Sequence, residues 1–321
     1  MGVPDKEDFR EPLVPEQRVP SQRFVAVCDV LGFRSLSSSM SVGALATKYD
    51  LLVREGTRSY ISVREYPTPN PGKAKHYRPG MTVFSDTMLL WSNIVDEHTA
   101  PSYESTFFNF IGAFFGLALR LGFPLRVGIA FGDCVIEPDR NLYIGGPIVD
   151  AYLAGESQDW VGVGCHRSCF KAPGAQNMIL VDTILEYKVP LKPSGLGSEY
   201  IQHTIDWPFW SLGVAARGTD DDLGPLLSEK LVQHLGTRFE ARWKRTLEYY
   251  RFRISVWNKR FSGKFSRTAY LKSRRRAIAA LEGVIQPVSS TSTTPEKRSK
   301  RHRLKMSAET RQRLAEAKKA W

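Results

Sequence analysis

Two apolar, β-prone runs constrain the fold of this chain most, because each is interrupted by one aspartate. The run 24–33 (FVAVCDVLGF) contains Asp29, and the run 81–91 (MTVFSDTMLLW) contains Asp86. A carboxylate inside or at the end of a buried strand is costly to desolvate unless a cation meets it. Two carboxylates from separate strands can meet at one metal site. The pair therefore indicates a site for divalent cations.

The order of the predicted elements indicates the fold class. A strand at 24–30 turns at Gly32 into a helix near 41–60, and a Pro/Gly-rich break at 67–72 separates that helix from the second strand. The next elements are an apolar helix at 106–122, two strands within 125–136 joined by a turn at Gly132-Asp133, a helix at 148–157 and strands at 160–165, 178–182 and 198–204. This order predicts an α/β fold, more closely an α+β sandwich with a mainly antiparallel sheet and helices packed on one face of it.

Composition shifts divide the chain into four parts. We expect a flexible arm over 1–20, a main domain over 21–210, a mostly helical basic C-terminal extension over 211–286, and a basic linker and tail over 287–321. The formal charge of +12 is uneven, because residues 240–321 hold 23 Lys and Arg against 6 acids, whereas the remainder holds 22 against 27. Nucleic acid is therefore a possible partner of the basic tail.

The five aromatic residues of the basic extension have helical spacing. Packing on the main domain is the favoured interpretation, and interleaving with nucleic-acid bases is the alternative. These residues are Trp243, Tyr249, Tyr250, Phe252 and Trp257.

The nearly uncharged segment 106–122 (TFFNFIGAFFGLALRLG) is barely long enough to span a bilayer. A single short helix between two soluble strands has no topological use, so we interpret it as a buried helix and expect no membrane contact. The first 20 residues lack the apolar core of a secretory signal. The four cysteines, Cys28, Cys134, Cys165 and Cys169, are interpreted as structural thiols in a cytoplasmic protein.

Four motifs in order carry a resemblance to one family. Asp29 is followed by Val-Leu-Gly-Phe, which resembles the DxxGF motif of class III nucleotide cyclases, and Asp86 is similar to the aspartate of that family's Gly-Asp hairpin. The run 126–133 (RVGIAFGD) resembles the family's R-x-G-I-x-x-G-x strands, and 146–152 (GPIVDAY) occupies the position of the following helix. The resemblance implies that 21–210 is a nucleotide cyclase catalytic domain.

The resemblance also implies the site. Two divalent metal ions, Mn²⁺ or Mg²⁺, would be held by Asp29, Asp86 and the backbone carbonyl of Val30, and would activate the ribose 3′-hydroxyl and neutralise the triphosphate. Backbone amides at the turn into the next helix would hold phosphate oxygens. Those amides belong to Leu31, Gly32, Phe33 and Arg34.

The departures from the family pattern concern the base. Thr82 stands where purine cyclases have the base-reading lysine, and Tyr143 where they have an aspartate. Asp150 replaces the catalytic asparagine, and Ala154 replaces the transition-state arginine. This pattern resembles the Pycsar-type bacterial anti-phage cyclases, so we expect a uridylate cyclase that converts UTP to cyclic UMP and pyrophosphate, with CTP as the alternative substrate.

Three further expectations follow from the resemblance. A separate effector protein would bind the cyclic nucleotide. The enzyme would be a homodimer with shared active sites, in which Asp29 and Asp86 come from one subunit and Tyr143 and Asp150 from the other, and the helix 106–122 would help to bury the dimer contact. The rival interpretations are an ordinary adenylate or guanylate cyclase, and a nucleic-acid-binding protein with a cyclase-like scaffold.

Overall fold

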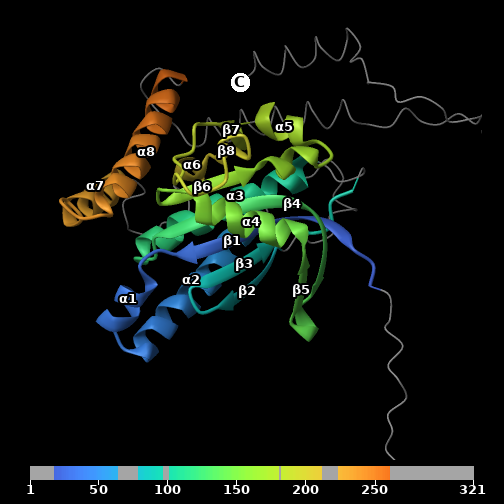
Figure 1. Ribbon diagram of the computed structural model, residues 1–321, viewed down its shortest axis with the longest axis horizontal. Coiled ribbons are helices and arrows are strands. Elements are labelled where there is room, and N and C mark those ends of the chain that lie inside the picture. The colour runs from blue at the N-terminus through green and yellow to red at the C-terminus, as the bar shows by residue number, and fades with distance from the viewer. Residues whose placement is uncertain (1–17, 64–78, 97–100, 181, 212–222, 261–321) are drawn as a thin grey trace, which may run out of the picture.

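The structure is a computed structural model that describes residues 18–63, 79–96, 101–180, 182–211 and 223–260 (Figure 1). Residues 1–17 of the predicted arm (1–20), the break at 67–72 and the basic tail over 287–321 lie outside the described residues.

One mixed sheet of eight strands organises the described residues. Its order is β2-β3-β1-β4-β6-β8-β7, with β5 paired to β4. All neighbours are antiparallel except β4 and β6, which are parallel. The strands are β1 (Ser21–Val30), β2 (Gly80–Phe84), β3 (Thr87–Trp91), β4 (Leu125–Glu137), β5 (Leu142–Gly145), β6 (Gly162–His166), β7 (Ile184–Glu186) and β8 (Ile201–Ile205). The predicted mainly antiparallel α/β sandwich is confirmed.

Helices cover both faces of this sheet, and the prediction that they lie on one face is wrong. Even-numbered residues of β1 face the main core, which includes α3, whereas odd-numbered residues face α4. Figure 1 shows α4 in front of the sheet, with α2 and α3 behind it. The helices are α1 (Phe33–Ser39), α2 (Val42–Val63), α3 (Pro101–Arg120), α4 (Gly146–Ser157), α5 (Ala175–Leu180), α6 (Trp207–Ser211), α7 (Gly224–Gln233) and α8 (Glu240–Arg260). Short 3₁₀ turns occur at Pro138–Arg140 and Arg167–Lys171.

The apolar helix α3 is the centre of the core, as the buried-helix interpretation predicts. Its apolar side chains from Phe107 to Leu119 are all buried within the one chain. Gly112 and Gly116 let α6 approach closely, since a Cβ at Gly116 would lie 2.2 Å from the Ser211 Cβ. No helix among the described residues is long and apolar enough to cross a membrane. The suggestion that α3 buries a dimer contact is wrong, because its apolar surface is already covered.

Three predicted elements are wrong in detail. The run 81–91 is a hairpin rather than one strand, and Ser85-Asp86 forms its two-residue loop. The run 125–136 is one strand, because Gly132 and Asp133 stay paired with β1 instead of turning. The segment 178–182 is no strand, since α5 extends through 180 and β7 begins at 184.

The C-terminal helix α8 packs on the sheet, as expected for its aromatic residues. Trp243, Tyr249, Tyr250 and Trp257 are buried, whereas Phe252 is 47% exposed. Their helical spacing therefore reflects packing rather than a stacking platform for bases.

Hydrogen bonds fix α8 to Val161, the residue before β6, and to the end of β8. The Thr246 hydroxyl accepts from the backbone amide of Val161 and donates to its carbonyl. The Tyr249 hydroxyl donates to the carbonyl of Ile205. Figure 1 shows α7 and α8, in orange, at one end of the molecule.

Candidate active site

The fold brings the two aspartates of the sequence prediction together. Asp29 is next to the last residue of β1 and pairs with Thr87, the first residue of β3. Asp86 directly precedes that strand, and its carbonyl accepts a hydrogen bond of 3.0 Å from the amide of Val30. The two aspartates therefore lie at one corner of the sheet, where β1 ends and the β2–β3 hairpin turns.

The hydroxyl of Tyr49, from α2, is buried and interacts electrostatically with both aspartates of this corner. Burial, then Asp86, then Asp29, raises the pKa of Tyr49 to about 12. Its ring packs edge-on against Phe33 and Phe123. The hydroxyl is buried and finds no hydrogen-bond partner among the described residues. A buried hydroxyl without a hydrogen-bond partner is uncommon in folded proteins, and here it lies within the electrostatic influence of both carboxylates.

Arg126 on β4 is the cation at this corner. Sequence analysis did not predict its ion-pair partners. It pairs directly with Asp29 across the two strands, and its Nη2 donates to Asp29 Oδ2 at 2.8 Å. The same Nη2 also donates to Glu156 Oε1 from the last turn of α4. Lys192 Nζ lies 3.4 Å from the other oxygen of Glu156. Two carboxylates and two cations thus form one cluster.

Two glycines explain why Glu156 reaches Arg126. A Cβ at Gly128 of β4 would lie 2.0 Å from the carbonyl oxygen of Ala151, and a Cβ at Gly155 would lie 3.4 Å from the Gly128 amide nitrogen. The backbones of α4 and β4 therefore touch at this point, since neither has a side chain there. This close approach places the end of α4 directly over the start of β4, where Arg126 lies.

The expected phosphate-binding turn follows β1. Gly32 adopts a left-handed φ of 74° and caps α1, which begins at Phe33. The first amides of a helix have no partner inside it. The Leu31 amide, in contrast, donates to the carbonyl of Pro124 at 2.8 Å. That bond removes Leu31 from the expected set and leaves the amides of Gly32, Phe33 and Arg34.

Of the expected base-side residues, the structure places only Thr82 on the sheet face of Asp29, in the neighbouring strands of the same end of the sheet. Thr82 pairs with Leu89, which pairs with Val27 on the α4-facing side of the sheet. Asp29, two residues after Val27 on β1, faces the same side of the sheet as Val27.

Tyr143 and Asp150 lie elsewhere in the chain. Tyr143 on β5 pairs with Ile136 and packs on Trp91 with ring centroids 5.6 Å apart. Ile136 is ten residues along β4 from Arg126, a distance of about 33 Å in an extended strand. The Asp150 Oδ2 lies 3.5 Å from Nδ1 of His166, whose pKa is lowered by burial and raised less strongly by Asp150. Within one chain, Tyr143 does not join the carboxylates.

The residues at the corner fit a Mg²⁺ or Mn²⁺ ion that shares its coordination with a nucleotide. Among the described residues there is no group of three or more His, Cys, Asp or Glu side chains that would hold a metal alone. Mg²⁺ sites in phosphoryl-transfer proteins commonly use one or two carboxylates and complete the shell with water and substrate phosphates. Asp29 and Asp86 supply that number.

The four cysteines are free and buried, as expected for structural thiols.

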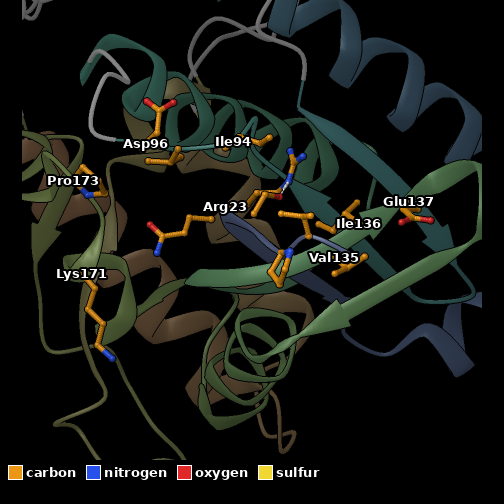
Figure 2. A pocket seen from close by; sticks show the side chains of 13 residues that line it. Arg23, Ile94, Asp96, Val135, Ile136, Glu137, Lys171 and Pro173 are labelled. Atoms are coloured by element: carbon orange, nitrogen blue, oxygen red, sulfur yellow. Dashed lines mark hydrogen bonds between the residues drawn. The ribbon is translucent and has the colours of Figure 1, made fainter. Parts of the chain in front are cut away.

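A cavity of about 750 Å³ lies at the other end of β1, and Figure 2 shows its lining. It is formed by the start of β1, by the segment after β3, by the end of β4 and by Lys171 and Pro173. Ser21 is eight residues from Asp29, or about 26 Å along an extended strand. Of the two acids that line the cavity, Glu137 is paired with Arg18 and Arg140. The cavity is therefore separate from the carboxylate corner.

Solved structures with a similar fold are nucleotide cyclases. The adenylyl cyclase CyaB from P. aeruginosa is 14% identical over 63% of this chain and 98% of its own, with a TM-score of 0.41. The guanylate cyclase domain of RhGC from Catenaria anguillulae, in complex with GTP, is 13% identical over 57% and 94%, with a TM-score of 0.39. No protein-family profile and no curated protein matches the chain. Similarities this distant carry no weight in assigning an activity, which rests on the residues of this chain.

Proposed function

We propose that the chain is a metal-dependent nucleotide cyclase. The observation that carries this proposal is the meeting of Asp29 and Asp86 at one corner of the sheet, with the backbones of Val30 and Asp86 hydrogen-bonded at 3.0 Å. This corner also has the orphaned hydroxyl of Tyr49 and a turn with helical amides directly after β1. Carboxylates that hold cations, next to amides that hold phosphates, are what positioning a triphosphate requires.

The mechanism assigns a task to each group at the corner. The bound divalent ions would lower the pKa of the ribose 3′-hydroxyl and neutralise phosphate charge. The carboxylates of Asp29 and Asp86, with the carbonyl of Val30, would hold those ions in place. The amides of Gly32, Phe33 and Arg34 orient the phosphate oxygens, so that the 3′-oxygen attacks the α-phosphate and pyrophosphate leaves. Positioning and charge supply most of the catalysis.

We further propose a pyrimidine base, with UTP as substrate and CTP as the alternative. Thr82 lies on the same sheet face as Asp29 and offers one hydroxyl, which both donates and accepts a hydrogen bond. The Tyr143 ring is larger than the aspartate of purine cyclases and leaves room for a smaller base. On this proposal the product is a second messenger in anti-phage defence, read by a separate effector protein.

A homodimer with shared sites is part of the proposal. One chain places Tyr143 far along β4 from Asp29, so the two can join one site only if they come from different subunits. Several apolar side chains of α4 and β5 are exposed, which is typical of a surface that a partner covers. They are Ile144 (60% exposed), Val149 (57%), Tyr152 (50%) and Leu153 (40%).

The test of the proposed function uses the purified full chain with Mn²⁺ and each of the four NTPs separately. We expect cyclic UMP or cyclic CMP and pyrophosphate, with little product from ATP or GTP. Asp29→Ala and Asp86→Ala should abolish the product while circular dichroism shows a retained fold. Asp133→Ala is the matched control, because Asp133 is an exposed aspartate of β4 away from the corner. Near-normal turnover in either folded corner variant refutes the assignment, and equal turnover of ATP refutes the pyrimidine base.

The shared site has its own test. Asp29→Ala and Tyr143→Ala chains, each nearly inactive alone, should recover activity when mixed, because each heterodimer contains one intact composite site. Native mass spectrometry confirms that heterodimers form. If they form and no activity returns, each site is built within one chain.

A further inference from the structure

The guanidinium of Arg126 is shared between two carboxylates in an unusual way. A guanidinium usually meets a carboxylate with two parallel N–H donors. Here a single nitrogen, Nη2, contacts both Asp29 Oδ2 and Glu156 Oε1. The Arg126 side chain is only 6% exposed, and its Nε is buried with no hydrogen-bond partner among the described residues. The arginine is therefore held at a single atom between two competing anions.

The charges around Arg126 are balanced before any ion binds. Asp29 and Glu156 contribute two negative charges, and Arg126 and Lys192 contribute two positive charges. A divalent cation on Asp29 neutralises that carboxylate and places further positive charge near the buried guanidinium. A buried charge that loses its counter-ion is strongly destabilising. Arg126 therefore needs a second anion that stays in place, and Glu156 is the one within reach.

We propose that Glu156 is a positioning residue that takes over Arg126 when a divalent cation occupies Asp29. The inference rests on the proposed function, since it assumes the cation site at Asp29 and Asp86. Glu156 acts through Arg126 and does not itself bind the ion. Its position is fixed by the close approach of α4 and β4 at Gly155 and Gly128, and Lys192 holds its other oxygen.

Without the Glu156 charge, Arg126 has Asp29 as its one anionic partner in this cluster. The cation must then displace the arginine from Asp29 and leave it buried without a counter-ion. We expect Glu156→Gln, which keeps the shape and removes the charge, to weaken Mn²⁺ binding by about tenfold or more. The loss should appear in direct binding of the metal, in the absence of nucleotide, and not only in turnover.

The experiment is a titration of the full chain with Mn²⁺ alone, in which electron paramagnetic resonance measures the free ion. Asp159→Asn is the matched control, because Asp159 is a nearby acid whose ion pairs are with Arg242 and Arg245 rather than with Arg126. The Mn²⁺ dissociation constant of the Asp159→Asn chain should stay within about twofold of the wild type, because this substitution leaves Asp29, Arg126 and Glu156 in place. Thermal unfolding of each variant shows that the chain remains folded.

A double-variant cycle separates positioning from a structural or direct role. In an Arg126→Gln background there is no buried cation to relocate, so adding Glu156→Gln should change the dissociation constant by less than about twofold. Glu156→Asp, which keeps the charge, should retain part of the wild-type affinity. An equal loss with and without Arg126 overturns the proposal, as does a Glu156→Gln chain that binds Mn²⁺ like the wild type.

Failure of the proposed function is distinguishable in the same titration. If wild-type binding depends on Asp86 but not on Glu156, the cation site stands and the role of Glu156 is refuted. If wild-type binding is absent or unchanged by Asp86→Ala, the cation site itself is refuted, and the role of Glu156 with it.

Discussion

Breaking the ion pair between Arg253 and Asp206 should cost a large share of the stability of this protein. Arg253 of α8 donates through Nε to Asp206 Oδ1 at 3.2 Å and through Nη2 to Oδ2 at 2.8 Å. The Asp206 side chain is fully buried, and that of Arg253 is 6% exposed. Asp206→Ala leaves a buried guanidinium without its carboxylate, at a cost of about 3–5 kcal/mol. Typical domains have a free energy of unfolding of only about 5–15 kcal/mol.

The assay is urea unfolding of the full chain, followed by tryptophan fluorescence. The buried Trp207 and Trp257 lie close to the pair in sequence and report its surroundings. Arg253→Met should show a comparable loss, since it leaves Asp206 buried and unpaired. The double variant removes both charges and should lose less than the sum of the single losses, by about 2 kcal/mol or more.

An exposed pair within α2, Asp50 with Arg54, supplies the control. Its Asp50→Ala variant should change the free energy of unfolding by less than about 1 kcal/mol, because solvent screens exposed pairs. A loss below about 1 kcal/mol for Asp206→Ala, or single losses that simply add, would refute the reasoning that this pair is a mutually dependent buried unit.

Three further changes have expected outcomes in the same unfolding assay. Ser85→Gly should stabilise the chain by about 1 kcal/mol, because Ser85 has a left-handed φ of 57° that glycine adopts without strain. Gly128→Ala should destabilise it by about 1–3 kcal/mol or more, since the added Cβ would lie 2.0 Å from a carbonyl oxygen of α4. His203 has its pKa lowered by burial, with Glu186 opposing. It therefore stabilises the fold above pH 6.5 and loses that contribution as the pH falls, so His203→Gln should make the decline below pH 6.5 shallower.

For each of these three variants, one result would contradict the physical reason given for the expected change. A Ser85→Gly chain less stable than the wild type would mean that the hydroxyl, and not the backbone, decides that loop. An unchanged free energy of unfolding in Gly128→Ala would mean that α4 can move away from β4 without loss of stability. An unchanged pH profile in His203→Gln, measured at pH 7.5 and 5.5, would mean that another group controls acid sensitivity.

The elements that sequence predicted well are those with strong and long patterns. The helix now seen as α3 was predicted from 17 nearly uncharged residues, 106–122, and α8 from the spacing of its aromatic side chains. Both patterns exceed the length at which a helix and a strand are ambiguous. Short apolar runs are ambiguous between a helix and a strand. The run 178–182 therefore suggested a strand, whereas its first residues belong to the helix α5.

Turns were predicted less well because their usual residues were absent or misleading. The β2–β3 hairpin turns at Ser85-Asp86, where no glycine marks a positive φ. Gly132-Asp133 looks like a turn, yet pairing with β1 keeps it extended. Pairing with other strands decides the conformation of both segments, and a short stretch of sequence does not contain that information.

The carboxylate corner was predictable in part. Asp29 and Asp86 interrupt apolar runs, so each stands out alone. Arg126 also interrupts an apolar run, but the sequence does not connect it with Glu156 and Lys192, because residues separated by 30 and 36 positions become neighbours only through the packing of α4 on β4. No residue pattern signals such a cluster before the fold is known.

The attachment of α8 to Val161, the residue before β6, has a consequence for folding during synthesis of the chain. Thr246, which satisfies both backbone groups of Val161, is made 85 residues later, and chains are synthesised from the N-terminus. While translation is under way, β6 and the end of β8 have no α8 to cover them. A nascent chain that ends before about residue 240 leaves the amide and carbonyl of Val161 and the carbonyl of Ile205 without their partners on α8. Incompletely covered surface makes partial chains prone to aggregation and proteolysis, so we expect the main domain to finish packing only after α8 has been made.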